Sequence, residues 1–370
     1  MNRIDNIYEK IIDKQNLYRA AALAQRTRRY KPTSADFNFK LEQEIESLYN
    51  ELSSRTYRHG RYRQFTIYEP KKRMIAAAPF RDRVVHHAVH DIIEPAIDPS
   101  FIYDSYACRR GKGTHKAIDR AQSFLRANNF CLHGDIRKYF PSIDHHVLKS
   151  LVRKKIEDKS LLWLLDELID SALFLKGGLP IGNLTSQFFA NLYLNELVRF
   201  VKHELRMRYY IRYMDDFLIF SSAKAPLIRA KNILRKFLRE CLCLRLHEGK
   251  SQIYKTATGI KFLGFRLYNN FRRLSTQNIR FFRKRLRSYE ALFMLGEMTQ
   301  CRLRDSVRSW VAHSSCADTH GLRIRILNEL FERNAPFGYL LKDVLMTQTL
   351  LPASVDMDRE AFVYKAGYVR

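Results

Sequence analysis

YIRYMDDFLIF, residues 210–220, places two adjacent carboxylates, Asp215 and Asp216, inside an otherwise apolar run. The residues on either side favour a buried strand, where Asp is uncommon. Two like charges side by side in a poorly hydrated place repel each other and raise each other's pKa. The stretch therefore predicts either a tight hairpin with a polar tip, or a hairpin that presents both carboxylates to a divalent cation, which offsets repulsion and desolvation together.

The charge of the chain indicates a polyanionic partner. Its 370 residues include 65 Lys and Arg against 38 Asp and Glu, which gives a net charge of +27. Such an excess favours binding to nucleic acid or to an anionic membrane surface. No run approaches the ~18 apolar residues of a membrane span, and the N-terminal MNRIDNIYEK has no apolar signal region. We therefore expect a cytoplasmic protein that binds nucleic acid and no membrane.

Length and periodicity predict an α+β protein with two or three subdomains. A chain of 370 residues is too long for one ordinary core, and its strands and helices alternate without the regularity of βαβ units. The composition changes near residue 270, where FRRLSTQNIRFFRKRLRSYE (271–290) has a helical and very basic pattern. The six cysteines lack the paired spacing of a zinc site, so we expect them to be reduced and buried.

A third carboxylate stands where another apolar strand ends. FCLHGDIRKYFPSIDHHVL (130–148) has the pattern of a strand, a loop and a helix, and Asp135 follows the strand. A two-metal phosphoryl-transfer site needs carboxylates from different chain segments, which hold ions about 3.5–4 Å apart. Asp135, Asp215 and Asp216 provide such a set, although an Asp at a strand end more commonly caps a helix.

Five motifs around these carboxylates resemble those of reverse transcriptases. In chain order they are Asp135-Ile136 (motif A), GLPIGNLTSQ at 178–187 (motif B), Tyr213-Met214-Asp215-Asp216 (motif C), Lys250 in LHEGKS (motif D) and FLGFRL at 262–267 (motif E, the primer grip). A lone Y-x-D-D is weak support. Five motifs in the family's order, together with the net charge of +27, identify the chain as a member of this family.

The resemblance implies a right-hand polymerase with fingers, a palm of antiparallel sheet packed on helices, and a helical thumb. The N-terminal extension and fingers would cover residues 1–130, the palm with a fingers insertion 131–270, and the basic helical thumb with a C-terminal tail 271–370. The implied activity is RNA-directed DNA polymerisation from dNTPs, with two Mg²⁺ ions as cofactors.

The resemblance also implies the site residues. The expected catalytic residues are Asp135, Asp215, Asp216 and Lys250. The three carboxylates and the Ile136 carbonyl would hold two Mg²⁺ ions, and Lys250 would act as a general acid near the leaving pyrophosphate. The expected nucleotide-binding residues are Arg73, Phe140, Ile181, Gly182 and Gln187. The expected nucleic-acid-binding residues are Arg110, Lys112, Gly264, Arg272, Arg273, Arg280, Arg283, Lys284 and Arg287.

Two of the nucleotide-binding residues have a direct physical rationale. Arg73 matches a fingers residue that grips the triphosphate, a task that suits a guanidinium fork. Phe140, which follows Asp135 along the chain, falls where the family places a steric gate. A flat ring under the sugar would clash with a 2′-hydroxyl and so favour dNTPs over rNTPs. An ordinary core phenylalanine is the alternative for Phe140.

Motif B indicates the subfamily. Many relatives have Gln-Gly at its start and Ser-Pro at its end, whereas this chain has Ile181-Gly182 and Ser186-Gln187. This form, and SWVAHSSCADTHGL at 309–322, resemble the reverse transcriptases of bacterial and phage diversity-generating retroelements. The resemblance implies copying of a template-repeat RNA into cDNA that carries substitutions at template adenines, with an RNA–cDNA duplex as product. It also implies a small basic accessory variability protein as partner.

Ile181 offers one physical link to low fidelity. A Gln at this position can hydrogen-bond near the nucleotide sugar, an Ile cannot, and one net hydrogen bond is worth about 1 kcal/mol. The alternative is that Ile181 only packs in the fingers, and neither explains why adenine is singled out. Two other functions remain open: a group II intron-type reverse transcriptase with maturase activity, and a non-catalytic RNA-binding scaffold.

Overall fold

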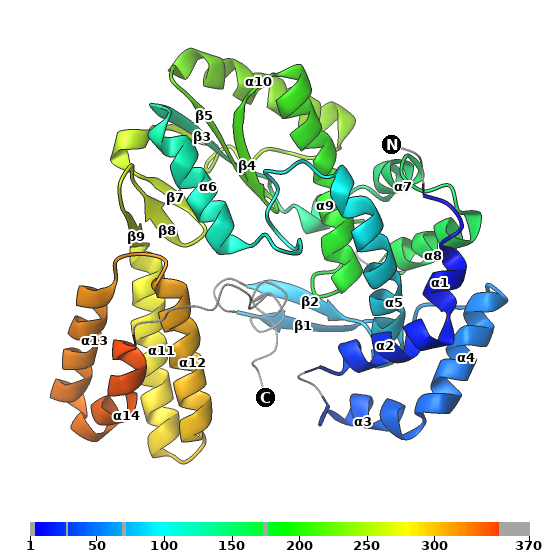
Figure 1. Ribbon diagram of the computed structural model, residues 1–370, viewed down its shortest axis with the longest axis horizontal. Coiled ribbons are helices and arrows are strands. Elements are labelled where there is room, and N and C mark those ends of the chain that lie inside the picture. The colour runs from blue at the N-terminus through cyan, green and yellow to red at the C-terminus, as the bar shows by residue number, and fades with distance from the viewer. Residues whose placement is uncertain (1–3, 27–28, 69–71, 173–176, 348–370) are drawn as a thin grey trace.

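The computed structural model describes residues 4–26, 29–68, 72–172 and 177–347. A four-stranded sheet lies in the upper part of Figure 1, the N-terminal helices at the lower right, and the C-terminal helices at the lower left. No helix within the described ranges is long and apolar enough to cross a membrane. Helices combined with antiparallel sheets confirm the predicted α+β class.

The central sheet forms from four short segments that are distant in the sequence. These are β3 (Phe130–Asp135), β4 (Tyr209–Tyr213), β5 (Asp216–Ser221) and β6 (Gln252–Lys255). Their order is β4-β5-β3-β6, and each neighbouring pair is antiparallel. The predicted hairpin at 210–220 is therefore present as β4 and β5, with a turn at Met214 and Asp215.

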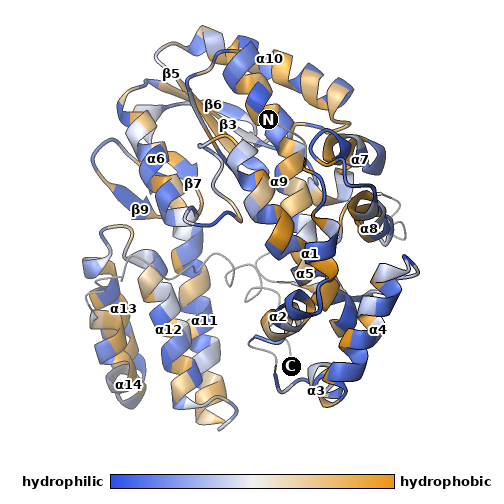
Figure 2. Ribbon diagram, turned by 45° about the vertical axis from the view of Figure 1, so that its right-hand side comes forward, coloured by the Kyte–Doolittle hydropathy of each residue, from blue (hydrophilic) through white to orange (hydrophobic). Residues whose placement is uncertain are grey.

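Both faces of this sheet are covered. One packs on α9 (Leu184–Arg199) and α10 (Lys224–Cys241), and the other packs on α6 (Thr114–Arg126). Side chains of a strand alternate between faces, so in β5 Phe217 and Ile219 join the first core and Leu218 and Phe220 the second. Figure 2 shows hydrophilic and hydrophobic residues mixed along α10, as expected for a helix with one face on the sheet. Burial on both faces fixes the register of the strands.

The N-terminal region begins with four helices. Its helices are α1 (Tyr8–Ile12), α2 (Lys14–Ala24), α3 (Pro32–Phe39) and α4 (Leu41–Ser53). Strands β1 (Arg63–Ile67) and β2 (Arg73–Ala77) then form an antiparallel hairpin. The long helix α5 (Phe80–Ile97) packs on α2. After the central strand β3 come α7 (His145–Arg153) and α8 (Lys159–Asp170), which are capped by the carboxylates of Asp144 and Asp158.

The glycine-rich segment before α9 folds against the turn that follows β3. The Leu179 N–H donates to the Phe140 carbonyl (2.8 Å), and the Gly178 N–H donates to the Ile143 carbonyl (3.0 Å). Gly178 has a φ of 84°, and a Cβ there would lie 2.6 Å from Pro141 Cα. Glycine is the one residue that tolerates both conditions, so this segment holds the Phe140 turn closely.

A second, three-stranded sheet leads into the C-terminal helices. It comprises β7 (Ile260–Phe262), β8 (Phe265–Leu267) and β9 (Arg272–Leu274), all antiparallel. The helices are α11 (Thr276–Met294), α12 (Gln300–Ser314), α13 (His320–Arg333) and α14 (Ala335–Met346). Shorter helical turns lie at Asp98–Ser100, Phe140–Ser142, Phe200–Glu204 and Thr256–Thr258.

The structure corrects two expectations for this region and for the cysteines. The helical pattern expected from residue 272 is wrong at its start, because β9 pairs with β8 and buries Leu274 before α11 begins. Cys241, Cys243 and Cys301 are exposed rather than buried, since they lie at or near helix ends. The predicted domain boundary after residue 270 falls between two strands of one sheet. Residues 348–370 of the predicted tail lie outside the described residues.

Replacing Gly134 with Ala should destabilise the fold. Gly134 lies opposite Phe217 in the β3–β5 pair, and a Cβ there would overlap the Phe217 ring. Overpacked cores lose about 1–3 kcal/mol, which urea denaturation would measure as a lower free energy of unfolding. The matched control is Gly321→Ala in α13, where a Cβ meets nothing within 4 Å. This variant should be as stable as the wild type or up to about 1 kcal/mol more stable, because alanine is the better helix former. Equal stability of the two variants would contradict the close packing of Gly134.

Candidate active site

Strand pairing brings the three predicted carboxylates to one end of the central sheet. Asp135 is the last residue of β3 and lies directly opposite Asp216, the first residue of β5. Tyr213 also pairs with Asp216 across the hairpin, so the turn between β4 and β5 consists of Met214 and Asp215. Residues about 80 positions apart in the sequence are therefore held side by side by backbone register.

Two basic side chains engage these carboxylates. Lys250 Nζ lies 2.7 Å from Asp135 Oδ2, and His133 Nε2 lies 2.6 Å from Asp216 Oδ1. Lys250 reaches this place because the segment after α10 runs beside the end of β3. There the His247 N–H donates to the Asp135 carbonyl (2.7 Å), and the Asp135 N–H donates to Ser251 Oγ (3.2 Å).

Burial makes the carboxylates of the turn hard to ionise. Burial, with added repulsion from Asp135 and Asp216, raises the pKa of Asp215 to about 6. Burial also raises the pKa of Asp216, although the hydrogen bond with His133 opposes this shift. Burial alone would lower the pKa of His133, but the bond with Asp216 outweighs it and the pKa is raised. The site is therefore short of positive charge.

This donor set fits a divalent cation. Carboxylate oxygens are the ligands that Mg²⁺ prefers, and a cation would offset both the burial and the added repulsion that raise the pKa of Asp215. In the described parts of the chain, no group of three or more His, Cys, Asp or Glu side chains already converges on one point. Asp135 and Asp216 would thus have to turn from Lys250 and His133 to share an ion. The Ile136 side chain is buried.

The predicted nucleotide-binding residues lie on three elements. Arg73 is exposed at the start of β2. Phe140 is 8% exposed, in the short turn held by the glycine-rich segment. Ile181 is half-buried against the main core, and its carbonyl accepts a hydrogen bond from the Ala76 N–H (3.2 Å). This bond ties motif B to the β1–β2 hairpin.

Gly182 and Gln187 belong to the same junction. Gly182 has a φ of 126°, which favours glycine, and a Cβ there would lie 3.2 Å from Ile75 Cγ2 of β2. Gln187 lies half-buried in the first turn of α9. The structure therefore brings motif B next to β2, and it keeps Arg73 exposed on that same hairpin.

The loop that contains the predicted nucleic-acid-binding residues Arg110 and Lys112 is anchored next to motif C. Arg110 pairs with Glu94 (3.3 Å). Lys112 is half-buried, and its ammonium lies 3.2 Å from the centre of the Tyr103 ring. Thr114 Oγ1 donates to the Tyr213 hydroxyl (3.1 Å), which fixes the end of this loop beside the catalytic turn. The contact of Arg110 and Lys112 with nucleic acid remains a prediction.

The predicted thumb residues divide into two groups. Arg272 pairs with Asp119 (2.7 Å) and Arg283 with Glu329 (2.5 Å). Arg280, Lys284 and Arg287 are exposed at helical spacing on one side of α11, and none forms an ion pair with a described carboxylate. Arg273 is exposed on β9, and Gly264 has a φ of 88° near His313.

Two polar residues of the site were not predicted from the sequence. His133 stands two residues before Asp135, and the alternation of a strand places both on one face. Arg212 lies on β4 and donates to the Met214 carbonyl (3.0 Å). Arg212 could have been noticed in the sequence, because it is a basic residue inside an otherwise apolar strand.

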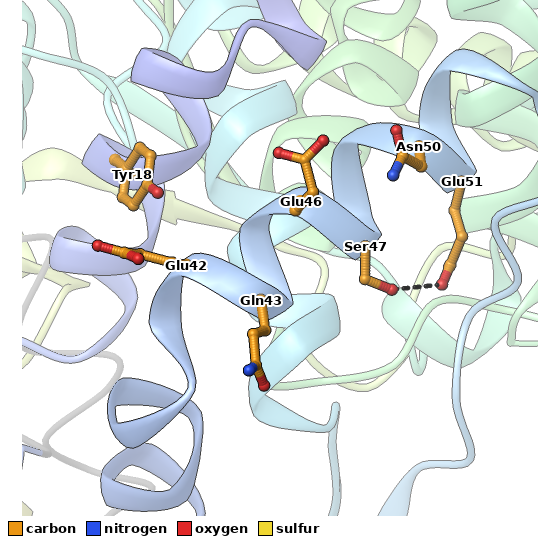
Figure 3. A pocket seen from close by; sticks show the side chains of 7 residues that line it. All are labelled: Tyr18, Glu42, Gln43, Glu46, Ser47, Asn50 and Glu51. Carbon is orange, nitrogen blue, oxygen red and sulfur yellow. Dashed lines mark hydrogen bonds between the residues drawn. The ribbon is translucent and has the colours of Figure 1, made fainter.

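A shallow hollow on α4 lies apart from these residues (Figure 3). It is lined by Tyr18, Glu42, Gln43, Glu46, Ser47, Asn50 and Glu51. Glu46 already pairs with Lys14 (2.6 Å) and Glu51 with Arg81 (2.6 Å). An acidic, ion-paired surface repels phosphate groups, so we do not assign it to the chemistry of the carboxylates.

Replacing Asp215 with Asn should stabilise the metal-free protein at neutral pH. Its pKa is raised on folding from 3.8 to about 6, so the stability that Asp215 contributes is present below about pH 4 and is lost as pH rises through about 6. Asp215→Asn should therefore gain ~1–3 kcal/mol above about pH 6 and almost nothing near pH 4. Thermal unfolding in a chelator across this range measures the difference. Asp305→Asn, at an exposed site on α12, is the control, and a gain for Asp215→Asn that does not change with pH would contradict the assignment.

Comparisons with known proteins agree with the motifs. A family model described as "Reverse transcriptase (RNA-dependent DNA polymerase)" matches residues 67–267. Protein YkfC of Escherichia coli (strain K12) is 28% identical over 277 residues, which cover 62% of this chain and 72% of YkfC. Group II intron-encoded protein LtrA of Lactococcus lactis subsp. cremoris is 27% identical over 178 residues, or 45% of this chain and 30% of LtrA.

A solved structure shares the fold. Apo telomerase from Candida tropicalis aligns with a TM-score of 0.50 at 12% identity, over 86% of this chain and 74% of that one. The matched segment 67–267 exceeds half of the 370 residues and contains all five motifs and the three carboxylates. The chain therefore belongs to the reverse transcriptase family, the RNA-directed DNA polymerases.

Proposed function

We propose that this chain copies RNA into DNA by a two-metal nucleotidyl transfer centred on Asp135, Asp215 and Asp216. The observation that carries the proposal is the β3–β5 register, which sets Asp135 opposite Asp216 beside the turn with Asp215. When bound, two Mg²⁺ ions would favour ionisation of the primer 3′-hydroxyl and steady the charge of the leaving pyrophosphate. The chain's own residues bind and orient the substrates.

Other residues take the roles that their positions allow. Lys250 is within hydrogen-bond reach of Asp135, so its ammonium stands ready to give a proton to the departing pyrophosphate. Arg73, exposed at the start of β2, grips the triphosphate of the incoming dNTP. The Leu179 N–H donates a hydrogen bond to the Phe140 carbonyl and so fixes the turn of Phe140. A fixed ring suits a steric gate, because it cannot move aside for the 2′-hydroxyl of an rNTP.

The thumb helix α11 provides the electrostatic part of the proposal. Arg280, Lys284 and Arg287 form an exposed basic stripe along it. Cations spaced along a helix can follow the phosphates of an RNA–DNA duplex. Arg272 and Arg283 are already paired with carboxylates of the chain, so we give them a smaller share of duplex binding.

Removing the turn carboxylates should abolish DNA synthesis. For Asp215→Ala/Asp216→Ala we expect at least about a thousandfold slower Mg²⁺-dependent dNTP incorporation, because several kcal/mol of transition-state stabilisation are lost. Primer extension on an RNA template measures the rate, with Asp305→Asn as a control of unchanged activity. A folded double variant that retains incorporation would refute the site, and a wild type that never incorporates would favour the RNA-binding scaffold.

We further propose that the enzyme is the reverse transcriptase of a diversity-generating retroelement. Support comes from motif B, in which Ile181-Gly182 and Ser186-Gln187 take the form of that subfamily. Its template would be a template-repeat RNA, its product cDNA with substitutions at template adenines, and its partner a small basic accessory variability protein. Such an enzyme would serve sequence diversification through mutagenic retrohoming.

A group II intron-type function is the second candidate. The similarity to LtrA favours it, as does a match to an intron protein of yeast, the "Putative COX1/OXI3 intron 2 protein" of Saccharomyces cerevisiae, which is 22% identical over 250 residues. This chain spans 30% of LtrA and 29% of the yeast protein. The two candidates differ in one measurable property, the pattern of copying errors.

Sequencing of cDNA made on an adenine-containing RNA should show errors concentrated at template adenines. Ile181→Gln should reduce these errors about fivefold, because a regained hydrogen bond near the sugar is worth about 1 kcal/mol. The accessory protein is added if synthesis requires it. The matched control is Ile233→Gln, at an exposed site on α10, which should leave the error pattern unchanged. Errors that are rare or evenly spread in the wild type would leave the intron-type enzyme as the better assignment.

A further inference from the structure

Arg212 is the largest fully buried side chain of the described protein. It is 0% exposed, in the middle of the sheet and core that support the carboxylates. Its guanidinium forms no ion pair with a carboxylate of the described residues, and its hydrogen bonds go to neutral oxygens. A buried charge without a carboxylate partner is rare, because desolvation costs several kcal/mol. Such an arrangement calls for a reason other than stability.

One end of the guanidinium fork holds the catalytic turn. Arg212 Nη1 donates to the Met214 carbonyl at 3.0 Å. Met214 has a φ of 55°, a left-handed conformation that is strained for a residue with a side chain. The next residue is Asp215, and Asp216 follows it. The bond from Arg212 therefore acts on the strained residue that sets the direction of both carboxylates.

The fork also binds two segments that are distant in the sequence. Arg212 Nη2 donates to Ser105 Oγ (2.8 Å), in the segment that leads to the loop with Arg110 and Lys112. Arg212 Nη1 also donates to Asn191 Oδ1 (3.3 Å), on the motif B helix α9. Asn191 is locked in turn, because its Nδ2 donates to the Ala107 carbonyl (2.7 Å). Three segments therefore converge on a single side chain.

The backbone strengthens this junction. The Arg212 N–H donates to the Asp104 carbonyl (2.9 Å), and the Tyr106 N–H donates to the Arg212 carbonyl (3.0 Å). Residue 105 thus runs as a short parallel bridge beside β4. The bridge fixes the backbone from which the guanidinium extends, and the hydrogen bonds to Met214, Asn191 and Ser105 fix the guanidinium itself.

We propose that Arg212 is a positioning residue that holds the Met214 turn and thereby aims Asp215 and Asp216 at the metal ions. The inference rests on the proposed two-metal function and goes beyond it, because Arg212 does not touch substrate or metal. The fork geometry is the essential property, since only a planar group with several donors can reach Met214, Asn191 and Ser105 together. A lysine keeps the charge and loses the fork.

A matched pair of asparagines on α9 separates this role from general packing. Asn191 is 1% exposed and contacts Arg212, whereas Asn195, one helical turn later, is 0% exposed. Neither polar side-chain atom of Asn195 has a hydrogen-bond partner among the described residues. Asn191→Ala and Asn195→Ala therefore remove the same atoms from similar surroundings, and only the first disturbs the Arg212 fork.

The experiment measures metal binding rather than activity alone. Mn²⁺ binding to the full chain is followed by electron paramagnetic resonance, without nucleotide, for wild type, Arg212→Lys, Asn191→Ala and Asn195→Ala. Primer–template affinity is measured by fluorescence anisotropy and folding by circular dichroism. Asp215→Ala/Asp216→Ala defines the signal of the site. If the wild type binds Mn²⁺ no better than this double variant, the proposed function fails, whatever Arg212 does.

For Arg212→Lys we expect about tenfold weaker Mn²⁺ binding, because the lysine ammonium cannot keep all the hydrogen bonds of the guanidinium fork. Asn191→Ala should also weaken Mn²⁺ binding, but by a smaller factor. Asn195→Ala should stay within about twofold of wild type, and primer–template affinity should hold in all three. Unchanged Mn²⁺ binding in folded Arg212→Lys overturns the proposal, as does an equal loss in Asn195→Ala. If Arg212→Lys does not fold, Asn191→Ala against Asn195→Ala decides alone.

Discussion

Crowding of negative charge at one end of a buried sheet is the constraint on which the rest of the structure depends. Asp135 and Asp216 face each other across two strands, and Asp215 stands next to them in the turn. Left alone, these carboxylates would turn outward or take up protons. The pKa of Asp215 is raised, first by burial and then by repulsion from Asp135 and Asp216, which favours its protonation. A scaffold that keeps the carboxylates together must be stiff in its backbone, because the side chains themselves repel.

The architecture supplies that stiffness from several directions. The sheet is buried on both faces, so its register cannot slip without exposing apolar surface. The ring of Phe217 fills the space over Gly134. Gly134 directly precedes Asp135, and Phe217 directly follows Asp216. The guanidinium of Arg212 donates a hydrogen bond to the carbonyl of the strained Met214. Lys250 and His133 neutralise part of the charge of Asp135 and Asp216 through ion pairs.

The sequence predicts local pattern well and long-range pairing poorly. The apolar run around Asp215 and Asp216, the strand before Asp135 and motif B at 178–187 could all be recognised, because each pattern is complete within about 20 residues. The pairs of Arg272 with Asp119 and of Arg283 with Glu329 were not, since no local pattern links charges so far apart. The strand β9 was missed because three residues with only one buried side chain carry too short an alternation.

In motif B, some positions support the fold through the backbone alone, and others through the lack of a side chain. Ile181 contributes to the fold through its backbone, since its carbonyl accepts the Ala76 N–H, and any residue at this position can make that bond. Its side chain is half-buried at the edge of the core, so it is not fully committed to packing. A substitution here can therefore change what the side chain offers to a nucleotide while the link between motif B and β2 persists. Gly178 has no such freedom, because its φ of 84° and its contact with Pro141 both exclude a side chain. Substitutions that keep the fold should accordingly concentrate at positions like Ile181, where the backbone makes the structural contact and the side chain is only partly buried.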